Sequence, residues 1–143
     1  MLIAVLFAGP RTAPGLPEWP RARAWISSLA GFALAVSGTG LLAASIFRLG
    51  SRNLTPLPSP RTGSTLVRSG PYRYVRHPMY AGGISLAYGW ALLVHGWLRL
   101  AYATALFLFF EIKVAREERW LAERFSDYPD YQRRTAKLIP FLH

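Results

Sequence analysis

The sequence predicts an all-α protein: a polytopic transmembrane helical bundle of three to four membrane helices, with a cytoplasmic loop and an amphipathic C-terminal helix. Two observations predict this fold class. Of the 143 residues, 52% are hydrophobic and 17% are charged, which is less charge than ordinary soluble domains carry. The apolar residues form a few long runs, and the 17 Lys and Arg lie mainly between and after these runs. At this length we expect a single domain over residues 1–143.

The net charge of +10 suits either nucleic acid or an anionic membrane surface. The chain contains no cysteine, which excludes a disulfide framework, thiolate metal sites and cysteine nucleophiles. We expect a functional site without a metal ion.

Residues 1–23 form a partial apolar segment followed by a loop. Met1 to Ala8 is apolar but would span only about 12 Å as a helix, and it lacks the basic n-region of a secretory signal. It is either a partial or re-entrant helix or the remnant of a longer first crossing. Four prolines then mark a surface loop: Pro10, Pro14, Pro17 and Pro20.

Residues 24–47 form the first predicted transmembrane helix. They contain no charged residue and would extend for roughly 36 Å, enough to cross a bilayer with some tilt. Small side chains recur at every fourth position, at Ser27, Gly31, Ala35, Thr39 and Ala43. Small residues are common in membrane helices, but five in register favour a face on which another helix packs closely.

Residues 79–115 form a predicted helical hairpin. The stretch 79–110 is apolar apart from one arginine and is too long for one crossing, so we expect a turn near residues 95–97. The small-residue ladder continues here at Gly83, Ala87 and Ala91. The second arm must run past Glu111, which places the polar end of this arm in the headgroup region.

The distribution of positive charge predicts the orientation. The 48–78 loop carries six arginines and no acid, and the chain from Lys113 onward carries seven more basic residues. The opposite side of the predicted helices carries four: Arg11, Arg21, Arg23 and Arg99. By the positive-inside rule, the 48–78 loop and the tail 116–143 lie in the cytoplasm. Because topology accounts for the basic residues and no nucleic-acid module is visible, we expect no nucleic-acid partner.

The end of the 48–78 loop carries more pattern than topology requires. Gly70-Pro71 marks a turn, and tyrosines and arginines crowd the residues that follow. Pro78 keeps His77 out of the helical region and suits the first turn of the next helix. Free N–H groups at that helix start, beside Arg76 and His77, form a seat for a carboxylate. The alternative is an interfacial belt of Tyr and Arg that anchors the membrane edge.

The C-terminal part of the chain contains an amphipathic helix, EIKVAREERWLAERF. Lys113 and Glu117 lie four residues apart and share one face, while Glu111 and Glu118 share another. Glu111 ends an apolar run, and an acid near the membrane is a functional candidate. Three further charges are expected to form a solvated face: Arg119, Glu123 and Arg124.

Two blocks of this sequence, taken together, resemble one family. The first block comprises STLV at 64–67, GPY at 70–72 and RHPMYAG at 76–82. The second has the form EExxLxxxFxxYxxY followed by proline, with Glu117-Glu118, Leu121, Phe125, Tyr128, Tyr131 and Pro140. They resemble the integral-membrane methyltransferases typified by isoprenylcysteine carboxyl methyltransferase, with the phospholipid N-methyltransferases as close relatives. The resemblance covers residues 50–142.

The resemblance implies S-adenosyl-L-methionine as the cofactor, held between the hairpin and the tail on the cytoplasmic side. The implied cofactor-binding positions are Ser64, Thr65, Leu66, Val67, Tyr72, His77, Pro78, Met79, Tyr80 and Glu117. The resemblance also implies a substrate contact at Lys113, and Arg76 and Glu117 as the catalytic residues. Thr135 and Lys137 stand where the family commonly has valine and arginine.

The chemistry of these side chains agrees with that cofactor, which carries a carboxylate, an ammonium and a sulfonium group. The helix start at Pro78 with His77 suits the carboxylate, and Glu117 suits the ammonium. Tyrosines suit adenine or the sulfonium. An acceptor carboxylate would need only a cation to orient it, whereas an amine acceptor would have to lose a proton.

We therefore predict an integral-membrane, S-adenosylmethionine-dependent methyltransferase of a lipophilic acceptor, carboxyl or amine, that is isoprenylcysteine-like or phospholipid-like. We expect it among the lipids of a prokaryotic inner membrane, with its active site facing the cytoplasm. The alternative is a catalytically silent basic membrane protein that binds anionic lipid or a protein partner. Lipid binding needs arginines but neither the HPxY block nor the paired glutamates, which favours the enzyme.

Overall fold

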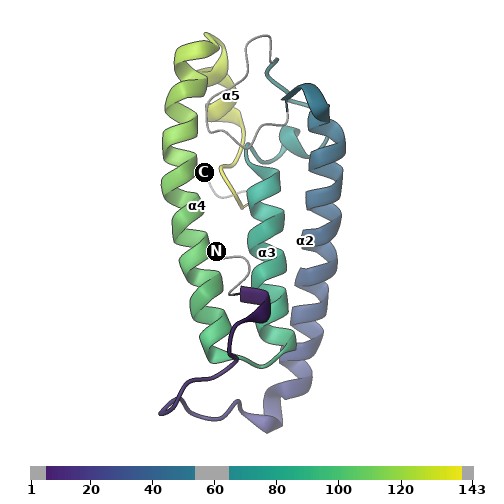
Figure 1. Ribbon diagram of the computed structural model, residues 1–143. Coiled ribbons are helices and arrows are strands. Elements are labelled where there is room, and N and C mark those ends of the chain that lie inside the picture. Colours follow the sequence, from purple (N-terminus) through teal and green to yellow (C-terminus); the bar gives the residue numbers. More distant parts are fainter. Residues whose placement is uncertain (1–5, 54–64, 140–143) are drawn as a thin grey trace. The chain divides into compact units, whose positions relative to one another are not determined.

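The computed structural model describes residues 6–53 and 65–139, which are mainly helical (Figure 1). The helices are, in chain order, η1 (Arg21–Arg23), α2 (Ala24–Asn53), η2 (Gly70–Arg73), α3 (Pro78–Leu93), α4 (Trp97–Arg124) and α5 (Tyr128–Arg134). These described ranges contain no strand, and an isolated parallel bridge joins Val75 to Ala136. The predicted all-α class is confirmed.

The chain forms two compact units, and each contains a part of α2, α3 and α4. Unit 1 comprises residues 1–40 and 82–109, and unit 2 comprises residues 41–81 and 110–143. The four basic residues predicted for the non-cytoplasmic side all belong to unit 1. The 48–78 loop and the tail 116–143 belong to unit 2, and so does the start of α3 up to Ala81.

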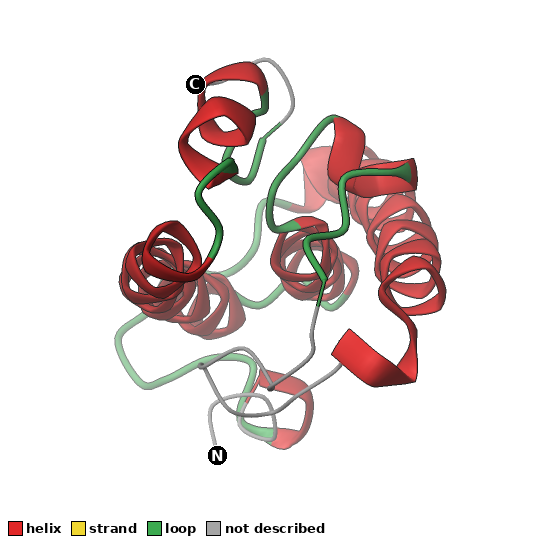
Figure 2. Ribbon diagram, turned by 90° about the horizontal axis from the view of Figure 1, so that it is seen from above, coloured by secondary structure: helices red, strands yellow, loops and turns green. Residues whose placement is uncertain are grey.

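In unit 1, α3 lies between α2 and α4 (Figure 2). The backbones of α2 and α3 approach so closely that a Cβ atom added at Gly31 would lie 2.8 Å from the carbonyl oxygen of Gly89. One added at Gly38 would lie 2.7 Å from the carbonyl oxygen of Gly82. Only glycine fits at these positions, because the atoms that a side chain would meet belong to the backbone. The predicted close approach of a second helix is therefore confirmed.

The small-residue ladder predicted on the first transmembrane helix makes only part of this contact. Gly31 and Ala35 face α3, but Thr39 and Ala43 are exposed, and Gly38 takes the inward position. The reason is geometric: four residues advance a helix by about 400°, so a strict four-residue ladder rotates about 40° per step away from the contact. On α3, too, the contact is made by glycines other than the predicted one.

The predicted hairpin turn is confirmed, since residues 94–96 separate α3 from α4. His95 adopts a positive φ of 51° in this turn. Its Nε2 lies 3.1 Å from Ser28 Oγ and 3.1 Å from the carbonyl oxygen of Ala24. The turn is thereby attached to the first helical turn of α2.

The N-terminal segment is attached to the hairpin by Arg99, which is 5% exposed. Its Nη1 donates to the carbonyl oxygens of Leu6 and Phe7 at 2.7 Å, and its Nη2 donates to that of Gly9 at 2.6 Å. Arg99 therefore caps the carbonyl end of the helical turn at residues 6–8. The remainder of the apolar segment, residues 1–5, lies outside the described residues, and both predicted alternatives for it stand.

One helical stretch of the described chain is long and apolar enough to cross a membrane. It is Arg21–Gly50, and only 17% of its most apolar window is buried. Large hydrophobic side chains are exposed along it, among them Trp25, Leu29, Phe32 and Val36. α3 has 16 residues, and the last part of the 28-residue α4 is highly charged. The expected number of three to four membrane helices thus remains a prediction.

Two element boundaries differ from the expected segments. α2 begins at Ala24, as predicted, but continues past Phe47 to Asn53, with non-helical angles at Gly50 (φ 70°, ψ 164°). α4 continues unbroken through residues 115 and 116, where the hairpin was expected to pass into the tail, and it ends at Arg124. The predicted amphipathic helix is therefore the C-terminal part of α4.

Candidate active site

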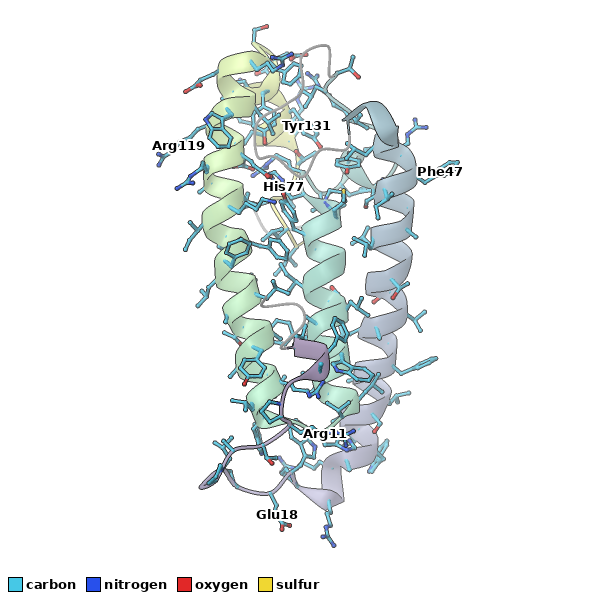
Figure 3. All side chains as sticks on the ribbon, in the orientation of Figure 1. Arg11, Glu18, Phe47, His77, Arg119 and Tyr131 are labelled. Atoms are coloured by element: carbon cyan, nitrogen blue, oxygen red, sulfur yellow. The ribbon has the colours of Figure 1, made fainter. Side chains whose placement is uncertain are left out.

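The candidate site lies wholly within unit 2, where the residues before α3 meet the C-terminal part of α4 and the tail. In Figure 3, Phe47 and Arg119 point outward from this unit, whereas His77 and Tyr131 point into it. His77 is 8% exposed and Tyr131 is 7% exposed. The 48–78 loop and the tail were expected to lie on the same side of the membrane, and here they are in direct contact.

The turn η2 is supported by the end of α2. Gly70 has a φ of 63°, and a Cβ atom there would lie 3.2 Å from Arg48 Cγ. Arg48 Nε donates to Ser69 Oγ at 2.8 Å. Tyr72 follows in this turn, and its carbonyl oxygen accepts a hydrogen bond from the Tyr131 hydroxyl at 2.5 Å. Burial, together with the neighbouring Tyr131, raises the pKa of Tyr72 to about 12, so its phenol stays protonated at neutral pH.

Backbone hydrogen bonds attach the tail to the residues before α3. The Arg76 amide donates to the Ala136 carbonyl at 2.8 Å, and the His77 amide donates to the Lys137 carbonyl at 3.2 Å. In return, the Ala136 amide donates to the Tyr74 carbonyl at 3.2 Å. These bonds form the short parallel bridge. The tail therefore fixes the backbone positions of Arg76 and His77.

α3 begins at Pro78, as predicted, and His77 caps it. The His77 carbonyl accepts hydrogen bonds from the amides of Tyr80 at 3.1 Å and Ala81 at 3.0 Å. Pro78 has no N–H group, so only the Met79 amide remains in this first turn. The expected seat for a carboxylate thus has one backbone donor rather than several.

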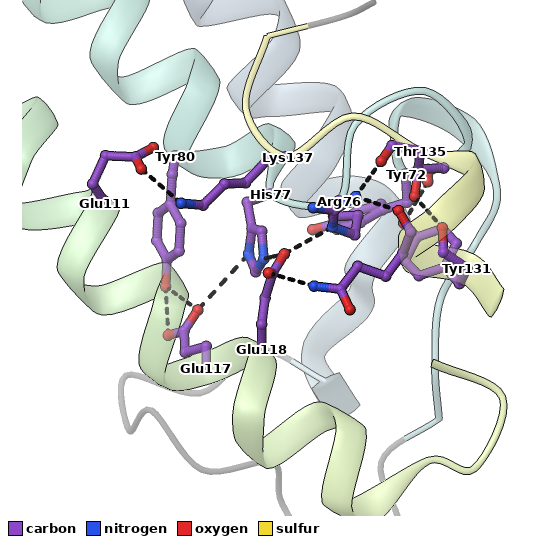
Figure 4. Close-up of polar contacts among 11 residues, drawn as sticks. Tyr72, Arg76, His77, Tyr80, Glu111, Glu117, Glu118, Tyr131, Thr135 and Lys137 are labelled. Atoms are coloured by element: carbon purple, nitrogen blue, oxygen red, sulfur yellow. Dashed lines mark hydrogen bonds and ion pairs between the residues drawn. The ribbon is translucent and has the colours of Figure 1, made fainter. Parts of the chain in front are cut away.

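Glu117 on α4 is the centre of the first polar cluster (Figure 4). The Tyr80 hydroxyl donates to its two carboxylate oxygens at 2.7 and 2.9 Å. Lys113 Nζ lies 3.6 Å from Oε1, and His77 Nδ1 lies 3.9 Å from Oε2. The predicted shared face of Lys113 and Glu117 is confirmed.

Aromatic rings enclose this cluster. The Tyr80 ring stacks on His77, with centroids 5.8 Å apart, and on Phe110, with centroids 4.6 Å apart. Lys113 Nζ lies 4.9 Å from the Tyr80 centroid, within cation–π range. The Glu117 side chain is 15% exposed, whereas Lys113 is 29% exposed. The cluster is therefore a largely desolvated carboxylate beside a cation and a row of rings.

Glu118, the next residue, is the centre of a second cluster. Its Oε1 accepts from Arg76 Nε at 2.7 Å and faces His77 Nε2 at 3.3 Å, and its Oε2 accepts from Gln132 Nε2 at 2.9 Å. Arg76 Nη1 also donates to the carbonyl oxygens of Gln132, at 2.8 Å, and Thr135. Burial alone would raise the pKa of Glu118, but hydrogen bonds from His77 and Arg76 and the charge of Arg76 lower it to about 2.

A third contact joins the tail to α4. Lys137 Nζ lies 2.6 Å from Glu111 Oε2, and both side chains are about one-third exposed. Glu111, a functional candidate from its position after an apolar run, therefore has a cationic partner from the tail. The charge of Lys137 is thereby engaged by a carboxylate of α4.

The structure brings together most of the predicted site residues. Arg76, His77, Tyr80, Lys113 and Glu117 lie in the two clusters, and Pro78 and Met79 form the adjoining helix start. Tyr72 belongs to neither cluster, and its carbonyl oxygen accepts a hydrogen bond from the Tyr131 hydroxyl. Ser64 lies outside the described residues. Thr65 is exposed, and Leu66 and Val67 are half-buried in the chain before η2; their place at the cofactor stays a prediction.

The residues in these polar contacts that were not predicted as site residues include Glu118, Gln132 and Lys137. Glu118 carries a signal in the sequence, because it is the second glutamate of the EExxL block. Gln132 carries none, since its role depends on a backbone pairing between segments about sixty residues apart.

A comparison with known families decides the classification. Residues 26–128 match the model of the family described as phospholipid methyltransferase. The chain belongs to this family. The match covers α3, α4 and all of α2 except its first two residues, whereas Gln132 and Lys137 lie beyond its end.

The chain is also similar to individual known proteins. The chain is 33% identical over 108 residues to the cobalt-zinc-cadmium resistance protein CzcN of Cupriavidus metallidurans, covering 72% of this chain and 48% of that protein. It is 31% identical over 129 residues to the protein-S-isoprenylcysteine O-methyltransferase of Mus musculus, covering 87% of this chain and 45% of that protein.

The fold is similar to that of a solved structure. The structure of the eukaryotic intramembrane Ras methyltransferase, isoprenylcysteine carboxyl methyltransferase, superposes with a TM-score of 0.71 at 26% identity, covering 98% of this chain and 48% of that one. The chain thus spans about half the length of these relatives. The predicted family and its helical fold are confirmed.

Proposed function

We propose that this member of the phospholipid methyltransferase family is an integral-membrane, S-adenosylmethionine-dependent methyltransferase that acts on a lipophilic acceptor. The observation that carries the proposal is the Glu117 cluster, in which a largely buried carboxylate lies beside a row of aromatic rings. Three of its members, His77, Tyr80 and Glu117, come from the RHPMYAG and EExxL blocks, which are distant in sequence. A protein that only bound anionic lipid would need neither of these two sequence blocks.

The residues present fit the charges of the cofactor. Glu117 would hold the ammonium group by a charge-assisted hydrogen bond, with the Tyr80 hydroxyl fixing the carboxylate. His77, aided by the Met79 amide, would receive the carboxylate. The Tyr80 ring suits a sulfonium by cation–π attraction. When bound, S-adenosylmethionine would supply an activated methyl group for in-line displacement.

The chain's own contribution to methyl transfer is alignment and exclusion of water. Lys113 lies nearer the apolar part of α4 than Glu117, so it would meet an acceptor that enters from the bilayer and would orient an acceptor carboxylate. Arg76, the second predicted catalytic residue, has Nε and Nη1 engaged with α4 and the tail, so it would act by holding these elements around the reactants. Proximity of this kind supplies about 7–11 kcal/mol in favourable cases.

The proposed setting is a prokaryotic inner membrane in which unit 2 faces the cytoplasm. The exposed apolar side chains of α2 would contact lipid, and the hairpin of α3 and α4 would complete a bundle of three to four membrane helices. The basic residues of the 48–78 loop and the tail support this orientation. The acceptor would then come from the membrane and the cofactor from the cytoplasm.

Calorimetry on the purified protein in lipid nanodiscs tests the proposal. The wild type should bind S-adenosylmethionine, and His77→Ala or Tyr80→Ala should weaken binding about ten- to hundredfold, the effect of losing a charge-assisted contact. Tyr74→Ala is the matched control, because Tyr74 is a tyrosine of the same segment that is 63% exposed. A folded wild type that does not bind would favour the silent membrane protein instead.

The acceptor can be identified by transfer of a radiolabelled methyl group. Purified protein and labelled cofactor would be incubated with lipid extracts of the native host and with isoprenylcysteine and phospholipid analogues. We expect label in an organic-soluble product. Label in no fraction, from a preparation that binds the cofactor, would contradict a lipophilic acceptor.

A further inference from the structure

Gln132 of α5 contacts both members of the ion pair between Arg76 and Glu118. Its carbonyl oxygen accepts from Arg76 Nη1 at 2.8 Å, and its side-chain amide donates to Glu118 Oε2 at 2.9 Å. Arg76 and Glu118 themselves are joined at 2.7 Å. One residue of the tail therefore constrains a guanidinium and a carboxylate that come from two other segments.

The contacts of Glu118 lead on to the proposed cofactor residues. Its other oxygen faces His77 Nε2 at 3.3 Å, and His77 Nδ1 lies 3.9 Å from Glu117. The side chains of these three residues are only 8 to 15% exposed. Polar contacts thus run from Gln132 through Glu118 and His77 to Glu117, within one desolvated region of unit 2.

The backbone that carries Gln132 is firmly held. Tyr128 is 1% exposed and Tyr131 is 7% exposed, so α5 buries both of its tyrosines. The Tyr131 hydroxyl binds the Tyr72 carbonyl, and the Thr135 hydroxyl binds the Tyr131 carbonyl at 2.5 Å. Because α5 is fixed in this way, the amide of Gln132 is a fixed donor rather than a mobile surface group.

We propose that Gln132 is a positioning residue, which orients the Glu118 carboxylate and through it the His77 imidazole that faces the cofactor. A carboxylate held by a donor on each oxygen has a fixed plane, and a ring that hydrogen-bonds to it takes a fixed orientation and tautomer. Gln132 itself does not touch the cofactor. The effect on cofactor affinity rests on the proposed function, whereas the effect on His77 does not.

A role limited to fastening the tail would predict different behaviour. In that case, loss of the Gln132 amide would lower stability but leave His77 and cofactor affinity unchanged, because the backbone bonds of the tail would persist. The two roles can therefore be distinguished by variants that first break the hydrogen bond between residues 118 and 132 and then restore it.

The test is a double-mutant cycle. Gln132→Glu places two carboxylates together and should weaken cofactor binding about tenfold or more, as expected for a broken buried hydrogen bond to a charged group. Combining it with Glu118→Gln restores one donor and one acceptor, and should recover at least about threefold of that loss. Gln132→Met, which keeps the shape without the donor, gives a second measurement if Gln132→Glu does not fold. Ser126→Glu, at an exposed tail position, controls for the added charge.

The second readout is the ¹⁵N chemical shifts of the His77 ring in protein without cofactor, assigned by comparison with His77→Ala. They should change in Gln132→Glu and Gln132→Met, and should stay unchanged in Ser126→Glu. Unchanged His77 signals, or a double variant that binds no better than Gln132→Glu alone, would overturn the inference. If the two variants show the expected His77 changes but the wild type binds no cofactor, the proposed function is contradicted and the positioning role stands.

Discussion

Glu117→Gln and Lys113→Ala should separate cofactor binding from acceptor handling on one face of α4. Glu117 accepts the Tyr80 hydroxyl at 2.7 and 2.9 Å, and its Oε1 lies 3.6 Å from Lys113 Nζ. Glu117→Gln keeps the size of the side chain and can still accept from Tyr80, but it removes the charge proposed to hold the cofactor ammonium. Lys113→Ala removes the cation proposed to meet the acceptor.

The expected magnitudes follow from these contacts. A lost charge-assisted hydrogen bond costs about 1.5–3 kcal/mol, so Glu117→Gln should weaken cofactor binding roughly ten- to hundredfold. The pairing of Lys113 with Glu117, as an i,i+4 pair at a partly exposed site, contributes only about 0.2–0.5 kcal/mol. Lys113→Ala should therefore leave cofactor affinity within about threefold of the wild type while turnover falls.

Both variants should be measured for cofactor affinity by calorimetry and for methyl transfer at saturating cofactor. Arg116→Ala is the control, since Arg116 is an exposed cation on the same helix. If Glu117→Gln and Lys113→Ala both leave affinity and methyl transfer unchanged, the shared face has only a structural role, and the site assignment on α4 is wrong.

Three further predictions concern packing, acid stability and topology. Gly89→Ala should destabilise the protein by about 1–3 kcal/mol, because the new Cβ atom would lie 2.6 Å from a backbone nitrogen of α2; Gly40→Ala, where nothing lies within 4 Å, should be neutral or stabilising in the same thermal-unfolding assay in detergent. The lowered pKa of Glu118 implies that its ionised form contributes about 3 kcal/mol to the free energy of unfolding above pH 4.5, and that this contribution is lost as the pH falls toward 2. Chemical unfolding across this range should therefore show a smaller loss of stability for Glu118→Gln than for the wild type. An equal loss would contradict the assignment. Single cysteines at Thr12 and Ser126 of this cysteine-free chain should be labelled from opposite sides of the membrane, with Ser126 on the cytoplasmic side; labelling of both from one side would refute the topology.

The helices of this fold could be predicted from the sequence because their limits are marked locally. The charge-free run gave the start of α2 at Ala24, and Pro78 gave the start of α3. The turn at residues 94–96 followed from a run too long for a single helix crossing. The sequence predicted that another helix packs closely on α2, but it did not predict most of the residues in contact. The four-residue ladder rotates off the contact face, and the close approaches to α3 are made at Gly31, Gly38 and Gly89.

The site could be predicted where its residues belong to compact motifs. His77 and Tyr80 share one block and Glu117 starts the other, so recognising both blocks placed them together. The contacts of Gln132 and Lys137 depend on the tail pairing with the residues before α3, and that pairing leaves no periodic pattern in either segment. The carboxylate seat at Pro78 was overestimated, because the Tyr80 and Ala81 amides bind the His77 carbonyl.

The two adjacent glutamates of the second block have different partners because consecutive residues of a helix point in different directions. Consecutive helical residues point about 100° apart, so Glu117 faces Tyr80 and Lys113 while Glu118 faces Arg76 and Gln132. His77 lies between them, with one ring nitrogen toward each carboxylate. This arrangement leaves Glu117 bound by a phenol and a partly exposed lysine, both of which a cationic ligand group could replace or share. Glu118 is bound by a buried guanidinium and an amide, so a ligand would have to break a buried ion pair to reach it. The different partners of these two adjacent residues therefore make Glu117 the better candidate to bind the cofactor and Glu118 the better candidate for a structural role in the site.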